Sequence, residues 1–136
     1  MSRLRTVLIL IALADWVAAE DVLIAHQSVP VEAVDQATLR DVFLGRRTTW
    51  PNGERVVVIF QRDTAANDRL AGRLGKTPQQ LVNWWKRLVF TGEGSMPEQI
   101  DMREDMFAHV SRIPGAIGWV ERPEVVPTGL KVLAAP

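Results

Sequence analysis

The chain contains 136 residues, of which 47% are hydrophobic and 24% are charged, and its 16 basic residues balance its 16 acidic residues. This neutral composition argues against general affinity for nucleic acids or anionic membranes, which favour strongly basic surfaces. The chain contains no cysteine, which excludes disulfide bonds and thiolate chemistry. A hydrophobic core alone must therefore hold the fold together.

The N-terminal segment has the layout of a secretory signal peptide. Arg3 and Arg5 precede an apolar run that is too short to cross a membrane as a helix, and small residues follow it up to Ala19. We therefore expect a signal peptide at residues 1–19, periplasmic localisation and one domain at residues 20–136. The alternative is an uncleaved anchor or a cytosolic start. Without the first 19 residues, 14 basic and 15 acidic residues remain.

Two strands and one helix are predicted in the first half of the chain. Residues 21–29 form a short apolar run without helical periodicity, which indicates a strand. Asp35 is then placed to cap a helix whose apolar face consists of Leu39, Val42 and Phe43. Residues 55–61, RVVVIFQ, are continuous and β-branched, which is typical of a strand buried on both faces.

Helical periodicity dominates the middle of the chain. A helix is predicted to begin at Asp63 or Thr64 and to end at Gly75. The next begins with the capping signal TPQQ at residues 77–80 and carries the strongest periodicity of the chain, at Leu81, Trp84, Trp85, Leu88 and Val89. A further helix is expected at residues 101–112, with an inward face made of Met102, Met106, Phe107 and Val110.

Two strands are predicted to close the chain, at residues 116–120 and 130–133. The expected order is therefore strand, helix, strand, three helices and two strands. Strands separated by helices indicate the α/β class, with a mixed, mainly parallel sheet flanked by helices.

Two separated motifs resemble a known family. Residues 42–53, VFLGRRTTWPNG, resemble the I-F-x-G-x-x-x-x-W-x-x-G segment of periplasmic phosphate-binding proteins of ABC importers, and residues 114–120, PGAIGWV, resemble P-G-A-I-G-Y-V, which follows it in that family. Residues 85–92 are similar to a helix end in a short, single-domain subgroup. Full-length members hold their ligand between two lobes, so the resemblance implies a single lobe of a type II periplasmic binding protein.

The resemblance also implies an anion-binding stretch. The family's phosphate loop contains an arginine, an aspartate and then Ser-Gly-Thr at a helix start. Here Arg62 matches, Asp63 matches after a one-residue shift, and Ala-Asn-Asp replaces Ser-Gly-Thr. Because helix N-termini bind anions, Arg62, Asp63, Thr64 and Asn67 are the predicted ligand-binding residues. The alternative is that Asp63 or Thr64 only caps the helix and that Arg62 is solvated.

The basic loop inside the first motif offers a second set of contacts. Arg46, Arg47, Thr48 and Trp50 are candidates for contact with an anion or a protein partner. Alternatively, the two arginines only complement the negative C-terminal end of the preceding helix, and Trp50 packs over the edge of the sheet.

Catalysis and metal binding have little basis in the sequence. His26 and His109 are the only histidines, and neither a G-x-S-x-G turn nor an H-E-x-x-H motif is present. The acidic residues Asp101, Glu104 and Asp105 fall at a predicted helix start, where they compensate the helix dipole. We therefore expect no enzyme, no metal and no cofactor.

These observations predict an exported module that binds phosphate or another small oxyanion in phosphate uptake or sensing. The expected partners are a membrane transporter or sensor protein, and a second copy of the chain could supply the missing wall of the cleft. The alternative is a ligand-free adaptor for a membrane sensor, transporter or porin, which would use the loop around Arg46, Arg47 and Trp50 or the helix that carries Trp84 and Trp85.

Overall fold

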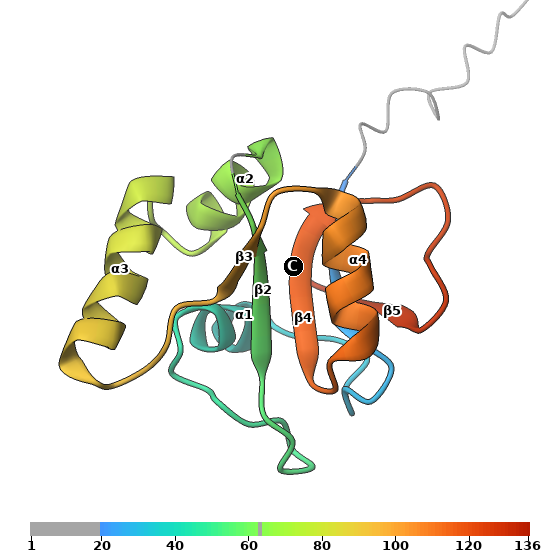
Figure 1. Ribbon diagram of the computed structural model, residues 1–136, viewed down its shortest axis with the longest axis horizontal. Coiled ribbons are helices and arrows are strands. Elements are labelled where there is room, and N and C mark those ends of the chain that lie inside the picture. Colours follow the sequence, from blue (N-terminus) through green and yellow to red (C-terminus); the bar gives the residue numbers. More distant parts are fainter. Residues whose placement is uncertain (1–19, 63) are drawn as a thin grey trace, which may run out of the picture.

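The computed structural model describes residues 20–62 and 64–136, so the predicted signal peptide and Asp63 lie outside the described residues. Within these ranges no helix is both long enough and apolar enough to cross a membrane. The elements follow one another in the order β1 (Asp21–His26), α1 (Gln36–Phe43), β2 (Val57–Gln61), α2 (Ala65–Arg73), α3 (Pro78–Thr91), β3 (Glu98–Ile100), α4 (Arg103–Arg112), β4 (Ala116–Glu121) and β5 (Leu130–Leu133) (Figure 1).

The strands form one mixed sheet in the order β3-β2-β4-β1-β5. β2 pairs in parallel with both β3 and β4, whereas β1 pairs antiparallel with β4 and with β5. Four strands therefore run in one direction and β1 runs against them, which confirms the predicted mixed, mainly parallel sheet. The carboxyl ends of β2, β3, β4 and β5 consequently lie along the same edge.

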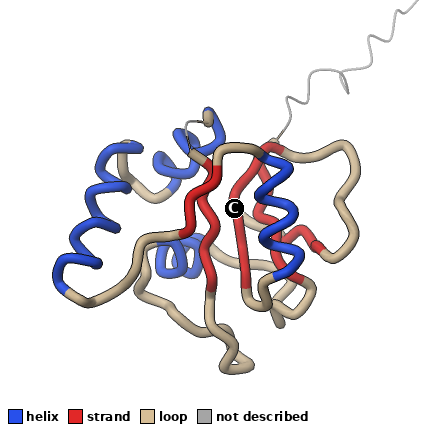
Figure 2. The backbone as a smooth tube through the Cα atoms, viewed as in Figure 1, coloured by secondary structure: helices blue, strands red, loops and turns tan. Residues whose placement is uncertain are grey.

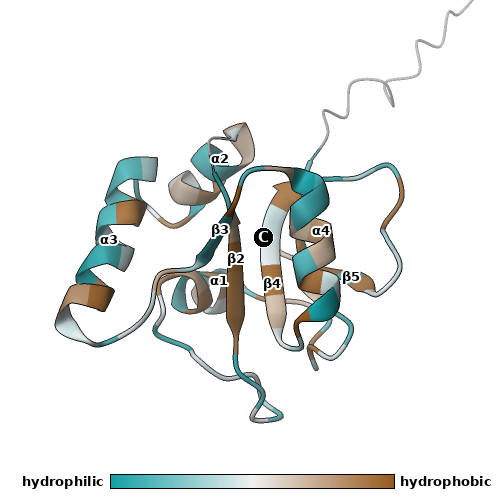
Figure 3. Ribbon diagram, in the orientation of Figure 1, coloured by the Kyte–Doolittle hydropathy of each residue, from teal (hydrophilic) through white to brown (hydrophobic). Residues whose placement is uncertain are grey.

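Helices cover both faces of this sheet, as the tube in Figure 2 shows. On one face, side chains of α1, α2 and α3 pack against alternate sheet residues such as Phe60 and Trp119. On the other face α4 packs alone, through Met106 and Val110, against residues such as Ile59. Figure 3 shows the resulting pattern: strand β2, between β3 and β4, is hydrophobic and the helices carry hydrophilic outer faces. β2 is thus buried on both faces, as its continuous apolar sequence predicts.

The helix starts follow the predicted capping chemistry. Asp35 accepts a hydrogen bond from the Thr38 amide, and hydrogen bonding by the Thr38 side chain, together with this bond, lowers the pKa of the Asp35 carboxyl. Thr64 caps α2, and Thr77 forms a capping box with Gln80 at the start of α3.

Three predictions about the C-terminal half were wrong. The short strand β3 was not predicted, because a three-residue strand has too few residues to establish an alternating pattern. Met102 is 59% exposed rather than inward, since it is the N-cap residue of α4 and precedes its first turn. Val89 is 51% exposed, because it lies in the last turn of α3, outside the buried stripe of Leu81, Trp85 and Leu88.

The loop between α1 and β2 is anchored by Trp50. Its side chain is only 2% exposed, and its indole Nε1 donates a hydrogen bond of 2.9 Å to the Gly115 carbonyl oxygen. Gly115 has a φ of 80°, and a Cβ atom there would overlap the Arg55 carbonyl oxygen. The structure therefore supports the interpretation that Trp50 serves the fold, and it explains why glycine follows Pro114 in the second motif.

Replacing Trp50 by phenylalanine should lower the free energy of unfolding by about 1–3 kcal/mol, because the buried Gly115 carbonyl would keep the Val57 amide but lose its second donor, and the smaller ring would leave part of the buried space unfilled. Chemical denaturation followed by tryptophan fluorescence or circular dichroism measures this loss.

Trp84→Phe is the matched control. The Trp84 indole also donates to a backbone carbonyl, that of Leu44 at 2.8 Å, but this bond is only partly buried, so water can replace the donor. Trp84→Phe should lower the free energy of unfolding clearly less than Trp50→Phe does. Equal losses in the two variants would contradict the special role assigned to the Trp50 bond.

Candidate functional site

Arg62 lies at the carboxyl edge of the sheet, directly after β2. Its Nε donates to Asp101 Oδ1 at 2.8 Å and its Nη2 donates to Oδ2 at 3.0 Å, so the guanidinium and the carboxylate form a bidentate pair. Both side chains are accessible, at 45% and 72% exposure. The Arg62 amide also donates to the Ile100 carbonyl. The end of β2 is therefore tied to the end of β3, and a carboxylate occupies the fork in which an anion would bind.

The start of α2 lies next to Arg62. Thr64 caps the helix, because its Oγ accepts a hydrogen bond of 3.2 Å from the Asn67 amide. The Thr64 hydroxyl proton remains a potential donor, and the N–H groups of the first helical turn point to the same edge. Arg62 and Thr64 are thus two residues apart at this edge, but the Arg62 guanidinium is directed to Asp101 and the Thr64 hydroxyl to the Asn67 backbone amide.

Asn67 does not face the solvent. It lies on the buried face of α2 with Leu70 and Ala71, and it is 4% exposed. Neither the nitrogen nor the oxygen of its side-chain amide has a hydrogen-bond partner within residues 20–62 and 64–136. Because both atoms are inaccessible, Asn67 would have to change its side-chain conformation before it could contact a ligand.

The basic loop of the first motif is divided between different environments. The amides of Arg46 and Arg47 donate to the Asp41 carbonyl at the end of α1, the location that the helix-dipole interpretation predicts. The Arg46 guanidinium lies 5.4 Å from the centre of the Trp84 ring, in a cation–π contact. Arg47 and Thr48 line a cavity, whereas Trp50 is buried away from it.

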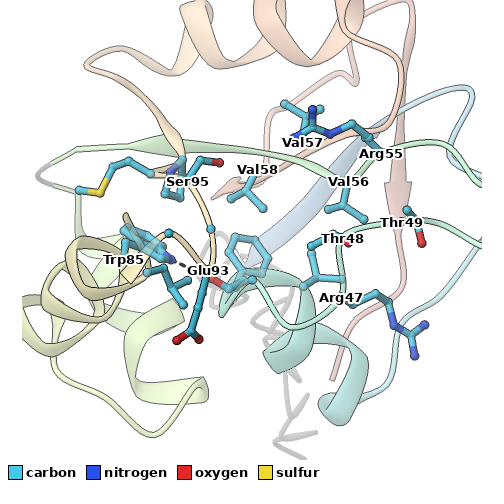
Figure 4. Close-up of a pocket in the computed structure, with 18 residues that line it drawn as sticks. Arg47, Thr48, Thr49, Arg55, Val56, Val57, Val58, Trp85, Glu93 and Ser95 are labelled. Carbon is cyan, nitrogen blue, oxygen red and sulfur yellow. Dashed lines mark hydrogen bonds between the residues drawn. The ribbon is translucent and has the colours of Figure 1, made fainter. Parts of the chain in front are cut away.

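This cavity has a volume of about 540 Å³ and lies between the C-terminal ends of α1 and α3 and the start of β2 (Figure 4). Its apolar wall comes from α1, β2 and α3, and its polar rim consists of Arg47, Thr48, Thr49, Arg55, Glu93 and Ser95. Arg47 and Thr48 of this rim are among the predicted contacts, whereas sequence reasoning missed Arg55 and Glu93. They belong to segments that are distant in the sequence, so no local signal marks them.

Ser28 lies just after β1 and links the side chains of His26 and Glu54. Its amide donates to His26 Nδ1 at 3.0 Å, its hydroxyl donates to Glu54 at 2.7 Å, and the Gly115 amide donates to the hydroxyl oxygen. His26 Nδ1 also lies 2.8 Å from the Ser28 hydroxyl oxygen, and the network as a whole ties β1 to the turn before β4. Among the described residues, no group of three or more His, Asp or Glu side chains could hold a metal ion.

Comparison with known proteins supports the fold. No model of a known protein family matches the sequence, and no curated protein matches it. Among solved structures, a putative phosphate ABC transporter substrate-binding protein with bound phosphate from Clostridium perfringens matches with a TM-score of 0.66 and 18% identity. An ABC-type phosphate transport receptor from Vibrio cholerae and PstS from Borrelia burgdorferi each match with a TM-score of 0.62 and 12% identity.

These matches cover 85% of this chain but only 44%, 45% and 46% of the three matched chains, respectively, so the chain spans less than half of their length. Identities this low support the fold and not the ligand. The chain therefore has the fold of one lobe of a periplasmic phosphate-binding protein, as the two motifs predict.

Proposed function

We propose that this protein binds phosphate or a related small oxyanion at the N-terminus of α2 and acts as an exported module in phosphate uptake or sensing. The proposal rests on two features of the carboxyl edge of the sheet: Arg62 directly follows β2 there, and Thr64, two residues later in the sequence, caps α2. In open α/β sheets this edge is where ligands bind. The phosphate-binding proteins that share the fold support the class of ligand.

The proposed mechanism is electrostatic capture. The positive end of the α2 dipole and its free N–H groups attract the anion, and the Arg62 fork and the Thr64 hydroxyl donate hydrogen bonds to its oxygens. Binding requires that the anion replace Asp101 on the Arg62 guanidinium. Because one lobe leaves the site open to solvent, we expect weak binding unless another protein supplies the opposite wall.

A membrane transporter or sensor protein is the proposed source of that wall. The expected pairing with a second copy of this chain finds no support in the fold or in the matched structures, and it is not part of the proposal. The matched proteins are substrate-binding proteins rather than enzymes, which agrees with a non-catalytic role.

A ligand-free adaptor is the second candidate function. It is favoured by one specific observation, the occupation of the Arg62 fork by the protein's own Asp101. The replacement of Ser-Gly-Thr by residues that include the buried Asn67 also removes hydroxyl donors from the start of α2. In that case the protein would act only through its surfaces.

Arg62→Ala should weaken phosphate binding about tenfold or more, because a hydrogen bond to a charged group contributes about 1.5–3 kcal/mol. Isothermal titration calorimetry with inorganic phosphate measures the change. Arg112→Ala, which removes an exposed arginine from the end of α4, is the control for net charge and should bind like wild type. Absence of heat with folded wild-type protein would reject anion capture and favour the adaptor.

Asp101→Asn should strengthen phosphate binding about two- to fivefold. The substitution keeps the shape of the side chain but removes the competing charge, and an exposed ion pair contributes roughly 0.2–1 kcal/mol. The same calorimetric titration tests this prediction.

Glu104→Gln is the matched control, because it removes one negative charge from the same helix start without touching Arg62. It should leave the affinity nearly unchanged. Weaker binding by Asp101→Asn would show instead that Asp101 holds Arg62 in its binding position.

A further inference from the structure

We propose that the cavity between α1, β2 and α3 binds an extended peptide segment of a partner protein, in which an acidic residue lies next to a bulky apolar residue. This site is separate from the proposed anion site, because the cavity lies at the start of β2 whereas Arg62 follows its end. The inference does not depend on anion binding.

The apolar part of the cavity is preformed. Phe43 and Trp85 are each 1% exposed, and Trp85 Nε1 donates a hydrogen bond of 2.8 Å to the Phe43 carbonyl, drawn as a dashed line in Figure 4. Val56 and Val58 of the β2 region pack against the same cluster and remain half-buried. A volume of about 540 Å³ is within the range of pockets that hold small ligands, and it is large enough for an apolar side chain.

The edge of β2 explains why the occupant should be extended. The Val57 amide donates to Gly115 beside β4, so the neighbouring amides of Val56 and Val58 point to the opposite side, toward the cavity. The Val56 amide donates to the Thr48 carbonyl, but β3 pairs with β2 only from Ile59 onward. Val58 therefore lies at a gap in the edge, and extended peptides bind at such edges through main-chain hydrogen bonds.

The charges at the cavity explain why an acidic residue is expected. Arg47 and Arg55 lie at one end, with Thr49, and Trp85 and Ser95 lie at the other (Figure 4). Neither arginine forms an ion pair with any residue that the structure describes.

Glu93 does not neutralise this end of the cavity. It is the single acidic residue among those that line the cavity, and Figure 4 shows its carboxylate turned away from Val58. A partner carboxylate at this end would compete with Asp35 for Arg47 and would meet Arg55, while its apolar neighbour would lie over the half-buried Val56 and Val58.

Selection from a display library of short random peptides tests the proposal with the purified protein. We expect the selected peptides to share an Asp or Glu within a few positions of Leu, Ile, Phe or Trp. A labelled synthetic copy of the most enriched peptide is then titrated by fluorescence anisotropy. Arg47→Glu and Arg55→Glu should each weaken its binding at least about tenfold, since each converts an attraction into a repulsion.

Two further variants separate the cavity from general charge effects. Ser95→Trp places a large side chain at the exposed rim and should also weaken binding at least about tenfold. Arg112→Glu makes the same charge change on α4, on the other face of the sheet, and should leave binding unchanged. Circular dichroism confirms that each variant is folded.

Saturating inorganic phosphate should not displace the peptide, because the two sites differ. The proposal is overturned if no sequence pattern is enriched, if Ser95→Trp binds the peptide as tightly as wild type, or if Arg112→Glu weakens binding as much as Arg47→Glu. Displacement by phosphate would overturn it as well, since the cavity would then be an anion site.

Discussion

The hydrogen bond from the Trp50 indole to the Gly115 carbonyl joins the two motifs on which the resemblance to phosphate-binding proteins rests. It ties the loop after α1 to the turn that leads into β4. Gly118, the second glycine of PGAIGWV, has its own packing reason, because a Cβ atom there would overlap the sulfur of Met106 in α4. The two motifs therefore describe how helices and loops are fitted to one sheet.

Because the two motifs serve the packing of the fold, the sequence predicted the fold more reliably than the ligand. The motif residues make contacts that any protein with this arrangement needs, whatever it binds. Structures with 12% to 18% identity accordingly share the fold, whereas the hydroxyl donors of the family's phosphate loop are absent here. Retention of the fold and loss of the donors are compatible, because the motifs and the start of α2 belong to different parts of the molecule.

Local patterns predicted most of the elements but not the contacts that link distant ones. The caps at Asp35 and Thr77 depend on neighbouring residues, so the sequence was sufficient to place them, and it limited the cap of α2 to Asp63 or Thr64, of which Thr64 is the one observed. The pairing of Arg62 with Asp101 depends on β3, a strand of three residues that gives no periodic signal. Sequence reasoning could therefore place Arg62 beside a helix start, but it could not find the carboxylate that occupies its fork.

The same limit applies to the cavity. Arg47 and Thr48 stand out in the sequence because they lie in a basic, hydroxyl-rich loop, whereas Arg55 and Ser95 are ordinary residues until the fold brings them to the same rim. The neutral net charge of the chain also gives no sign of the local excess of positive charge at this cavity. Arg47 and Arg55 lie at one end of it, and neither forms an ion pair with a described residue.

The positions of the two proposed sites determine how far a partner could complete the anion site. β2 separates them, and its five residues span about 17 Å at roughly 3.3 Å per residue. A peptide held at the cavity would therefore leave the region around Arg62 open to solvent. To wall off the anion, the partner would have to extend along α3 and β3 toward α2, which at about 3.3 Å per residue takes roughly five further extended residues or a folded domain. The two proposed functions thus belong to opposite ends of one strand, and a partner that served both would have to contact the protein along the whole length of β2.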